Sequence, residues 1–513
     1  MKNLFLLVLI TILFKIGLSQ NTLWYLTRGL TSDEVAWAVD TDEEGNIYWA
    51  IEQKDQWPYW YYNIAAFKIS SEGEQVWQSA SWDNGTGFND IAFVAKIKND
   101  NLYLAGRTDS SGFPTSGDAL LMCYNKNNGE LNWAKNLTQN PDFGYQEIDG
   151  INIESDGIYL TGWTNGATTD MDFFILKTDF SGNTVWINSW DYNSLGRFDG
   201  ANGHMVMDNN FIYTVGSINR SNISSLDGDG TLVCFSRANG AYQWHVEWDG
   251  GLYDDALGMT MSADSMLYTI GYLGTMNSGS QIMIRKYNRS GQLQWFKEWG
   301  NTGTEDTRAI VADGDSIIYA VGTTSSYGQG AKDIFVLKLD AHGNIIDSLF
   351  WGGAFDETAQ DVAIHDGILY ISGETRSFGN GQTNGTYSVD ALLLNINGRA
   401  MQAPDTLMTD INSDIVFQNE QISIFPNPFD ATTTISISEA SRASAPDKKQ
   451  LKIFDITGKL VFEDIYESNT YLLNRGTLES GVYFVEVAVD LSGTSTSSMS
   501  DRVKIYRGKL IVK

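Results

Sequence analysis

Residues 307–322 read TRAIVADGDSIIYAVG, and this stretch decides the fold. Two runs rich in β-branched and aromatic residues, 309–311 and 316–321, flank the turn DGD at 313–315. Such runs on either side of a glycine-containing turn are typical of two antiparallel strands. The stretch therefore predicts a β-hairpin.

The sequence on both sides of this hairpin completes a four-stranded unit. Downstream, residues 334–339 predict a third strand, and a polar turn follows at 340–344. Upstream, WFKEWG at 295–300 represents the fourth kind of strand, which carries a tryptophan. The unit is thus a small antiparallel sheet.

This unit recurs along most of the chain and is marked by seven tyrosines. They stand 51 to 56 residues apart, and six are followed by glycine three positions later: Tyr48, Tyr103, Tyr159, Tyr213, Tyr268, Tyr319 and Tyr370. Four strands per repeat of this length are typical of a propeller blade, whereas the coils of a parallel β-helix are much shorter. We predict an all-β fold with a seven-bladed β-propeller over residues 20–402.

The tryptophan strands indicate how the ring closes. Tryptophan recurs in the fourth strand as Trp24, Trp77, Trp133, Trp186, Trp244 and Trp295, and Asp347 takes the last register. The repeats begin with a tryptophan strand at 22–27 and stop after a third strand at 391–396. We expect these two strands to pair, because their pairing covers two open sheet edges.

Three stretches of the repeats resemble a known family. These are GNIY at 45–48, DGIYLTG at 156–162 and DIFVLKLDAHGN at 333–344. They are similar to the bacterial β-propeller repeats called SBBP, over about residues 24–400. The resemblance implies the fold and leaves the function open, because propellers host both binding and catalysis.

The N-terminal segment predicts export. Met1-Lys2-Asn3 and the apolar run LFLLVLITILF are typical of a secretory signal peptide over residues 1–19, cleaved after Ser19. A retained membrane anchor is the alternative, although the run is short for a bilayer span. We expect no transmembrane segment in the mature protein.

The repeat pattern stops near residue 403, and a different kind of sequence follows. Residues 403–419 have no strand pattern and predict a linker. Short alternating runs at 432–437, 451–454, 482–489 and 503–506 then predict a small Ig-like β-sandwich.

Four stretches of this segment resemble the type A C-terminal sorting domain of the type IX secretion system. They are IFPNPF at 424–429, IFDITGK at 453–459, SGVYFVEV at 480–487 and GKLIVK at 508–513. The sorting-signal residues among them are Pro426, Asn427, Pro428, Gly458, Gly481, Tyr483, Lys509 and Lys513. The resemblance implies that residues 420–513 engage the secretion machinery and that the protein is secreted or attached to the outer cell surface. An accessory sandwich that helps to bind a ligand is the alternative.

Charge and cysteine content limit the partners. The net charge of −29 repels phosphate backbones and anionic lipids, so we expect no nucleic-acid or membrane-surface partner. Such a surface favours cations or basic proteins. Cys123 and Cys234 occupy equivalent places two repeats apart, too far for a disulfide, and we predict free thiols in strands.

An acidic residue precedes every repeat tyrosine by 12 to 14 positions: Glu34, Asp90, Glu147, Asp199, Asp255, Asp306 and Glu357. In a propeller these residues lie near the start of the innermost strand and would form an acidic ring at one mouth of the channel. The ring could collect Ca²⁺ or bind a basic ligand. Alternatively, the acids accept backbone hydrogen bonds between blades.

The first repeat also contains an aromatic stretch, made up of Trp57, Tyr59, Trp60, Tyr61 and Tyr62 beside Pro58. Exposed rings of this kind can stack on sugars, whereas rings packed under a blade edge would be structural.

Four histidines, His204, His245, His342 and His365, show no metal-ligand spacing. Asp227-Gly228-Asp229-Gly230 resembles the start of a calcium loop without its downstream glutamate and predicts a turn.

These observations favour a non-catalytic binding protein displayed outside the cell, presenting a glycan- or protein-binding surface. We find no catalytic motif and predict no cofactor, apart from the open question of Ca²⁺ at the acidic ring. A polysaccharide lyase or glycosidase with paired carboxylates in the propeller mouth is one alternative. A structural adhesion component is the other.

Overall fold

The computed structural model divides the chain into two compact units, residues 1–406 and 407–513. It describes residues 23–29, 33–54, 61–84, 89–109, 117–137, 145–165, 171–192, 199–219, 228–250, 253–274, 279–378, 389–403, 422–425, 429–437, 449–455, 459–466, 468, 470–476, 478, 480–490 and 503–512. The predicted signal peptide and nearly all of the predicted linker lie outside these residues.

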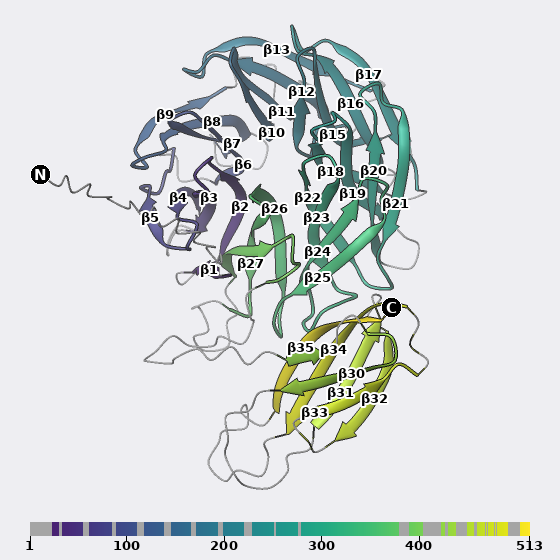
Figure 1. The fold of residues 1–513 in the computed structure, drawn as a ribbon. Helices are drawn as coiled ribbons and strands as arrows, with labels where there is room; N and C mark the ends of the chain where they lie inside the picture. The colour runs from purple at the N-terminus through teal and green to yellow at the C-terminus, as the bar shows by residue number, and fades with distance from the viewer. Residues whose placement is uncertain are drawn as a thin grey trace, which may run out of the picture. The chain divides into compact units, whose positions relative to one another are not determined.

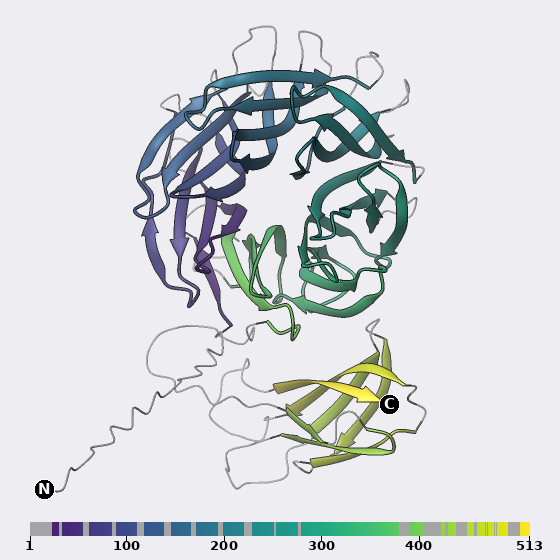
Figure 2. The same ribbon diagram turned by 45° about the horizontal axis from the view of Figure 1, so that its top comes forward.

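The first unit is the predicted seven-bladed propeller, with seven four-stranded antiparallel sheets around a centre (Figures 1 and 2). The first strands of the blades are β2 (Glu34–Thr41), β6 (Asp90–Lys98), β10 (Gln146–Glu154), β14 (Met205–Met207), β18 (Asp254–Met261), β22 (Glu305–Asp313) and β26 (Glu357–His365). The second strands are β3 (Ile47–Lys54), β7 (Asn101–Asp109), β11 (Gly157–Asn165), β15 (Phe211–Asn219), β19 (Leu267–Gly274), β23 (Ile317–Thr324) and β27 (Ile368–Thr375).

The remaining strands form the outer part of each blade. The third strands are β4 (Tyr62–Ile69), β8 (Gly117–Asn125), β12 (Met171–Thr178), β16 (Gly228–Ser236), β20 (Ser280–Tyr287), β24 (Asp333–Asp340) and β28 (Asp390–Asn397). The fourth strands are β5 (Gln75–Gln78), β9 (Leu131–Asn136), β13 (Thr184–Trp190), β17 (Tyr242–Trp248), β21 (Leu293–Trp299), β25 (Ile345–Trp351) and β1 (Tyr25–Arg28). The first strands contact one another from blade to blade and therefore surround the centre.

The ring closes as the sequence predicts. β1 pairs antiparallel with β28, with Tyr25 opposite Leu394 and Arg28 opposite Ala391. The backbone N–H of Trp24 donates to Asn395 Oδ1 at 2.6 Å. The seventh blade is thus built from both ends of the repeat region, and β1 begins at Tyr25, three residues later than the expected strand.

Packing between two aromatic rings explains the tyrosine and tryptophan repeat. All seven repeat tyrosines are buried in second strands. In six blades the tyrosine ring lies 5.9 to 6.2 Å from the tryptophan ring of the same sheet. Aromatic pairs at this separation stabilise beyond their buried area, so the spacing of these residues is set by the core of each blade.

The same tryptophans also join neighbouring blades. Trp295 Nε1 donates to the carbonyl of Ala341 in the next blade at 3.0 Å, and Trp24 Nε1 donates to the carbonyl of Ser71 at 3.1 Å. The tryptophan rings lie against turn glycines with left-handed backbone, such as Gly343 at φ +83°. A side chain there would strain the turn and collide with the ring. Trp24 therefore joins the seventh blade to the first in the way that the other tryptophans join their blades.

A second glycine position shapes the inner strand. The glycine three residues after the tyrosine faces a carbonyl of the first strand so closely that a Cβ at Gly162 would lie 1.8 Å from the oxygen of Glu147. Opposite this position the first strand has a bulge in six blades. Each bulge leaves one residue unpaired in the ladder. These residues are Trp37, Phe93, Asp149, Leu257, Arg308 and Gln360.

The second unit is a small β domain with two sheets. One sheet has the order β29 (Ile422–Phe425), β30 (Thr432–Ile437), β33 (Thr470–Asn474). The other has the order β32 (Leu460–Tyr466), β31 (Lys449–Asp455), β34 (Gly481–Asp490), β35 (Val503–Val512). Its buried core includes Ile435, Leu451, Val485 and Leu510. The expected runs lie in β30, β31, β34 and β35, and β29, β32 and β33 add three strands that the sequence analysis did not expect.

Two further expectations concern membranes and thiols. Within the described ranges, the chain forms no helix with the length and apolarity to cross a bilayer. Cys123 and Cys234 are both buried free thiols, in β8 and β16, as predicted. Burial raises the pKa of the Cys234 thiol to about 12, so this group is unreactive at neutral pH.

Candidate ligand-binding site

Three bulged residues of the inner strands, Asp149, Leu257 and Arg308, help to line a cavity at the centre of the ring. Its volume is about 290 Å³. It is lined by Glu147, Asp149, Trp163, Asn202, Asp255, Leu257, Tyr272, Asp306 and Arg308, from blades 3 to 6. We call it the channel cavity. Four carboxyl groups, one guanidinium group and two large aromatic rings thus face a space near the lower end of the range for small-molecule pockets, about 300–1,000 Å³.

Glu147 lies in β10 two residues before Asp149, which is the bulged residue of that strand. Arg107 Nη1 lies 3.1 Å from Glu147 Oε2, and the Tyr145 hydroxyl donates to the same oxygen at 3.0 Å. The Oδ2 atom of Asp149 is buried and has no hydrogen-bond partner among the described residues. Burial raises the pKa of Glu147, and burial together with the nearby Glu147 raises the pKa of Asp149 well above its usual range.

Asp255 is the third buried carboxyl group of the cavity. It accepts hydrogen bonds from Asn202 Nδ2 at 3.3 Å and from the backbone of Ala256 at 2.8 Å. Burial raises its pKa to about 7, against the lowering effect of these donors. A carboxyl group with a pKa of about 7 changes its charge near neutral pH, where binding of a ligand could displace its proton.

The opposite side of the centre is aromatic and acidic. Trp37 Nε1 donates to Glu52 Oε2 at 2.5 Å, and burial raises the pKa of Glu52 to about 7. The Arg308 guanidinium carbon lies 5.6 Å from the centre of the Trp37 ring, so a side chain of blade 6 reaches one of blade 1. The rings of Trp37 and Phe93 meet edge to face with centroids 5.2 Å apart. Except for Arg308, the side chains that make these contacts belong to blades 1 and 2, and the channel cavity is lined by blades 3 to 6.

A contact between distant blades crosses the centre. His204 precedes β14 in blade 4, and Asp361 lies in β26 of blade 7; His204 Nε2 is 3.7 Å from Asp361 Oδ1. Asp361 Oδ2 also accepts from the backbone of Val39 in blade 1 at 3.0 Å. His204 and Asp361 both stand nine positions before their repeat tyrosines, but the sequence gives no sign that these two blades meet across the centre.

The structure places the seven acids of the predicted ring in two different environments. Glu34, Asp90, Asp199 and Glu357 are fully buried in or beside their blades, with relative exposures of 0 to 1 %. Glu357, for example, accepts hydrogen bonds from Gly353 N at 2.6 Å, Thr375 Oγ1 at 2.8 Å and Ser377 N at 3.0 Å. Glu147, Asp255 and Asp306 instead line the channel cavity.

One residue of strand register separates the two groups. Glu305 and Asp254 occupy the places equivalent to Glu357, and each is buried. Glu305 Oε1 accepts from Thr324 Oγ1 at 3.0 Å, as Glu357 does from Thr375. Because alternate residues of a strand face opposite ways, Asp255 and Asp306 point to the channel and their neighbours do not.

The other predicted site residues lie away from this cavity or outside the described residues. Trp57, Tyr59 and Trp60 are outside the described residues; Tyr61 and Tyr62 are half-buried at the start of the third strand of blade 1. Lys54 Nζ lies 5.5 Å from the centre of the Tyr62 ring. His342 lies in the turn after β24, and His365 is the last residue of β26.

The calcium-like stretch is not the turn that the sequence predicts, because Gly228, Asp229 and Gly230 begin β16. Asp229, Asp249 and Asp254 each offer a carboxylate oxygen within 4.8 Å of the others. Such a set could hold a cation. Acidic side chains also gather at blade junctions for structural reasons, so proximity alone does not make this a metal site.

Sequence reasoning missed Asp149, Arg308, Trp163 and Tyr272. A signal for the first two exists, because the bulged residue stands 10 or 11 positions before the repeat tyrosine in six blades. Trp163 and Tyr272 directly follow the repeat glycines Gly162 and Gly271. Recognising the bulge from the glycine would have placed all four in the channel.

The sorting-signal residues are described in part. Gly481 and Tyr483 lie in β34, where Tyr483 joins the core, and Lys509 lies in β35. Pro426, Asn427, Pro428, Gly458 and Lys513 lie outside the described residues.

Comparison with known proteins identifies the C-terminal part of the chain. Residues 423–499 match the family described as the secretion system C-terminal sorting domain. The match indicates export by the type IX secretion system to the cell surface or the extracellular space. No curated protein matches the sequence. The SBBP resemblance of the repeats stays a prediction.

Solved structures similar to the chain are distant. The β-propeller domain of the Trilobed protease from Pyrococcus furiosus has 10 % identity and a TM-score of 0.39, covering 71 % of this chain and 95 % of its own. A protein of unknown function from Dyadobacter fermentans has 11 % identity and a TM-score of 0.42, covering 72 % and 97 %. The polysaccharide lyase Uly1 has 11 % identity and a TM-score of 0.43, covering 71 % and 90 %. Similarities at this level say nothing about the ligand.

Proposed function

We propose that this exported protein is a non-catalytic carbohydrate-binding protein whose ligand occupies the channel cavity. The observation that carries the proposal is the combination of groups lining one 290 Å³ space: Trp163 and Tyr272 with four carboxyl groups, Asn202 and Arg308. Aromatic faces stack on the apolar faces of sugar rings, and carboxylates, amides and guanidinium groups bind hydroxyls.

The charge of the cavity narrows the ligand to a sugar that carries a protonated amine. Of the described residues that line the cavity, Glu147, Asp149, Asp255 and Asp306 are acidic and Arg308 alone is cationic. A bound ammonium group would stabilise the ionised acids, whose pKa values burial raises in the free protein. The net charge of −29 also draws cationic ligands toward the protein.

Calorimetric titration of the full mature chain tests this proposal. Glucosamine and its oligosaccharides should bind, and the N-acetylated counterparts, which lack the charge, should bind at least about tenfold more weakly. Trp163→Ala and Asp255→Asn should each weaken binding. Asp315→Asn, which changes an exposed acid in a turn of blade 6, serves as the matched charge control and should bind like the parent.

A folded protein that binds no member of a broad glycan array would overturn the proposal. Binding to lysine-rich peptides in place of amino sugars would show that the cavity recognises a protein side chain. That result would also overturn it.

A polysaccharide-active enzyme is the second candidate, and one observation favours it. Three carboxyl groups with raised pKa values, Glu147, Asp149 and Asp255, line the same cavity, as required of a general acid paired with a base. The test is incubation with polysaccharides and assay of new reducing or unsaturated ends. Turnover that disappears in Asp255→Asn, with the melting temperature retained, would establish the enzyme and replace the binding proposal.

A further inference from the structure

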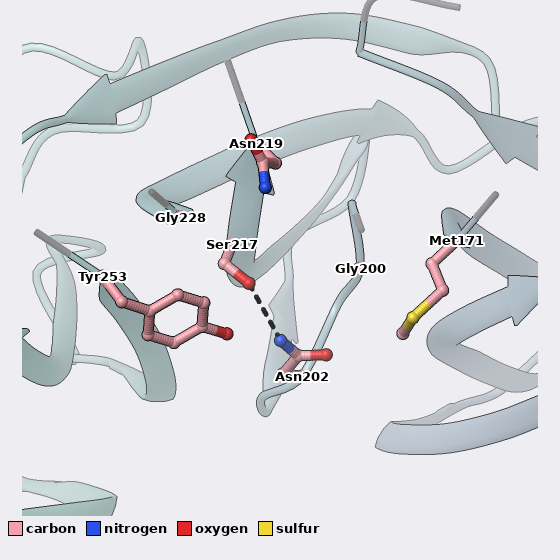
Figure 3. A pocket seen from close by; sticks show the side chains of 7 residues that line it. All are labelled: Met171, Gly200, Asn202, Ser217, Asn219, Gly228 and Tyr253. Carbon is pink, nitrogen blue, oxygen red and sulfur yellow. Dashed lines mark hydrogen bonds between the residues drawn. The ribbon is translucent and has the colours of Figure 1, made fainter. Parts of the chain in front are cut away.

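A second cavity lies next to the channel cavity and differs from it in chemistry. Its volume is about 280 Å³, and it is lined by Met171, Gly200, Asn202, Ser217, Asn219, Gly228 and Tyr253 (Figure 3). Among the residues that the structure describes, this lining includes no charged side chain. We call it the side cavity. Its amides, hydroxyls and one aromatic ring suit a neutral polyhydroxyl group.

Asn202 belongs to the linings of both cavities. Its Nδ2 donates to Ser217 Oγ in the side cavity at 3.1 Å and to Asp255 Oδ2 in the channel cavity at 3.3 Å. In Figure 3 the amide oxygen of Asn202 points away from Ser217. One side chain therefore ties together the polar groups of the two cavities at their boundary.

An aromatic wall also runs from one cavity to the other. Tyr253 lines the side cavity and Tyr272 lines the channel cavity, and their ring centroids are 6.2 Å apart at an interplanar angle of 32°. Rings at this distance can each support one unit of an extended ligand.

The inner strand of blade 4 lacks a side chain where other blades have one. Gly200 pairs with Ser217 at the register where blades 5 and 6 carry Asp255 and Asp306. A Cβ at Gly200 would lie 2.9 Å from Trp163 Cβ, so a larger residue does not fit. The regular first strand of this blade begins only at Met205. Blade 4 thus interrupts the acidic wall at the boundary of the two cavities.

We propose that the channel cavity and the side cavity are adjacent subsites for one oligosaccharide of at least two sugar units. The unit with the amine occupies the acidic channel cavity, and the next, uncharged part of the chain lies against Ser217 and Tyr253. This inference rests on the proposed carbohydrate-binding function and adds the length and polarity of the ligand.

The length dependence of binding tests the inference. A disaccharide of one glucosamine and one N-acetylglucosamine unit should bind the full mature chain about tenfold more tightly than glucosamine alone, because only the longer ligand reaches both subsites. Met171→Trp, which fills the side cavity, should reduce this ratio to about one. Tyr253→Ala, which removes the aromatic wall, should reduce it as well, and the melting temperature of each variant reports its folding.

A tryptophan introduced at an exposed position of an outer strand provides the control for Met171→Trp. Val185→Trp lies on the outer strand β13 at a residue that is 56 % exposed, and this variant should keep the full ratio. Equal affinities for monosaccharide and disaccharide in the parent protein would overturn the two-subsite inference and leave the proposed function standing. A ratio that persists in both Met171→Trp and Tyr253→Ala would also overturn it. Failure of both sugars to bind would overturn the proposed function itself.

Discussion

The outer and inner strands of this propeller differ in how strictly they repeat. The repeat tryptophan lies in five of the seven outer strands and directly before β1 in a sixth blade, and in these six blades it packs on the repeat tyrosine. The bulged residue of the inner strand is different in each of the six blades that have a bulge: Trp37, Phe93, Asp149, Leu257, Arg308 and Gln360. Packing between blades constrains the first set, whereas the second faces the channel. The proposed ligand site therefore lies where the repeat varies.

The largest effect is expected from removing the strand that closes the ring. Deleting residues 20–29 leaves β28 with an open edge and takes away Trp24, which binds the turn of blade 1 at Ser71. We expect loss of most of the stability of the domain, of the order of 5 kcal/mol or more. Thermal unfolding followed by circular dichroism measures this, and deletion of residues 20–22 alone is the control. A 20–29 deletion that melts like the parent would refute composite closure.

A single outer tryptophan should have the next largest effect. Trp295→Ala removes the ring contact with Tyr268 at 5.9 Å and the hydrogen bond to Ala341, at a cost of about 3 kcal/mol. Asp347 holds the same register in blade 6, and Asp347→Ala should cost less than about 1 kcal/mol. Urea unfolding midpoints compare the two. Similar midpoints would show that the repeated tryptophan does not stabilise the blades.

Substitution of a glycine in the second strand should affect both the stability of the blade and the channel cavity. A Cβ at Gly162 meets the oxygen of Glu147, so Gly162→Ala should cost about 2 kcal/mol and displace the bulge that carries Asp149. Gly314→Ala is the matched control, because its φ of +69° is strained while no atom lies within 4 Å of the new Cβ. The first variant should lose both urea stability and amino-sugar affinity, and the second should lose only a smaller amount of stability. Unchanged sugar binding in Gly162→Ala would separate the bulge from the site.

The smallest effect concerns the inner wall and depends on pH. The pKa of Asp255 is about 7 in the folded protein and 3.8 as its ordinary value, so between these pH values the folded state retains a proton that the unfolded state releases. The contribution of this group to stability therefore falls as the pH rises from about 4 to about 7. Asp255→Asn should raise the melting temperature at pH 7.5 and change it little at pH 4.

Asp315→Asn, at an exposed turn, is the control and should show no such difference between the two pH values. A melting temperature of Asp255→Asn that is lowered at pH 7.5 would mean that ionised Asp255 stabilises the fold. In that case burial would not be the main influence on this carboxyl group.

The fold could be predicted because its determinants recur. Tyr319, Gly322 and the tryptophan register appear at fixed spacing, and the pairing of residues 22–27 with residues 391–396 followed from counting strands. Three strands of the C-terminal domain were missed: β29 and β33 are short, with four and five residues, whereas β32 was missed although it has seven. Their place in the sheets is decided by tertiary pairing more than by local pattern.

The site could be predicted only in part, because its residues do not recur. The search for a repeated acid found Glu147, Asp255 and Asp306 but grouped them with Glu34 and Glu357, which face into the blade. A shift of one residue along a strand turns a side chain to the opposite face of the sheet. The spacing between each acid and its repeat tyrosine varies by two residues, so it cannot show which face an acid occupies. The contact of His204 with Asp361 could not be predicted from the sequence, since it depends on the closed ring.

The pairing of β1 with β28 also orders events during synthesis. The partner strand β28 ends at Asn397. Residues 25–28 therefore leave the ribosome before the other strands of the ring, and they have no strand to pair with until the last repeat has been translated. The export domain is made only after that point. A chain that terminates early therefore lacks both a complete seventh sheet and the tail recognised for secretion, and only products able to form the whole ring carry the signal to leave the cell.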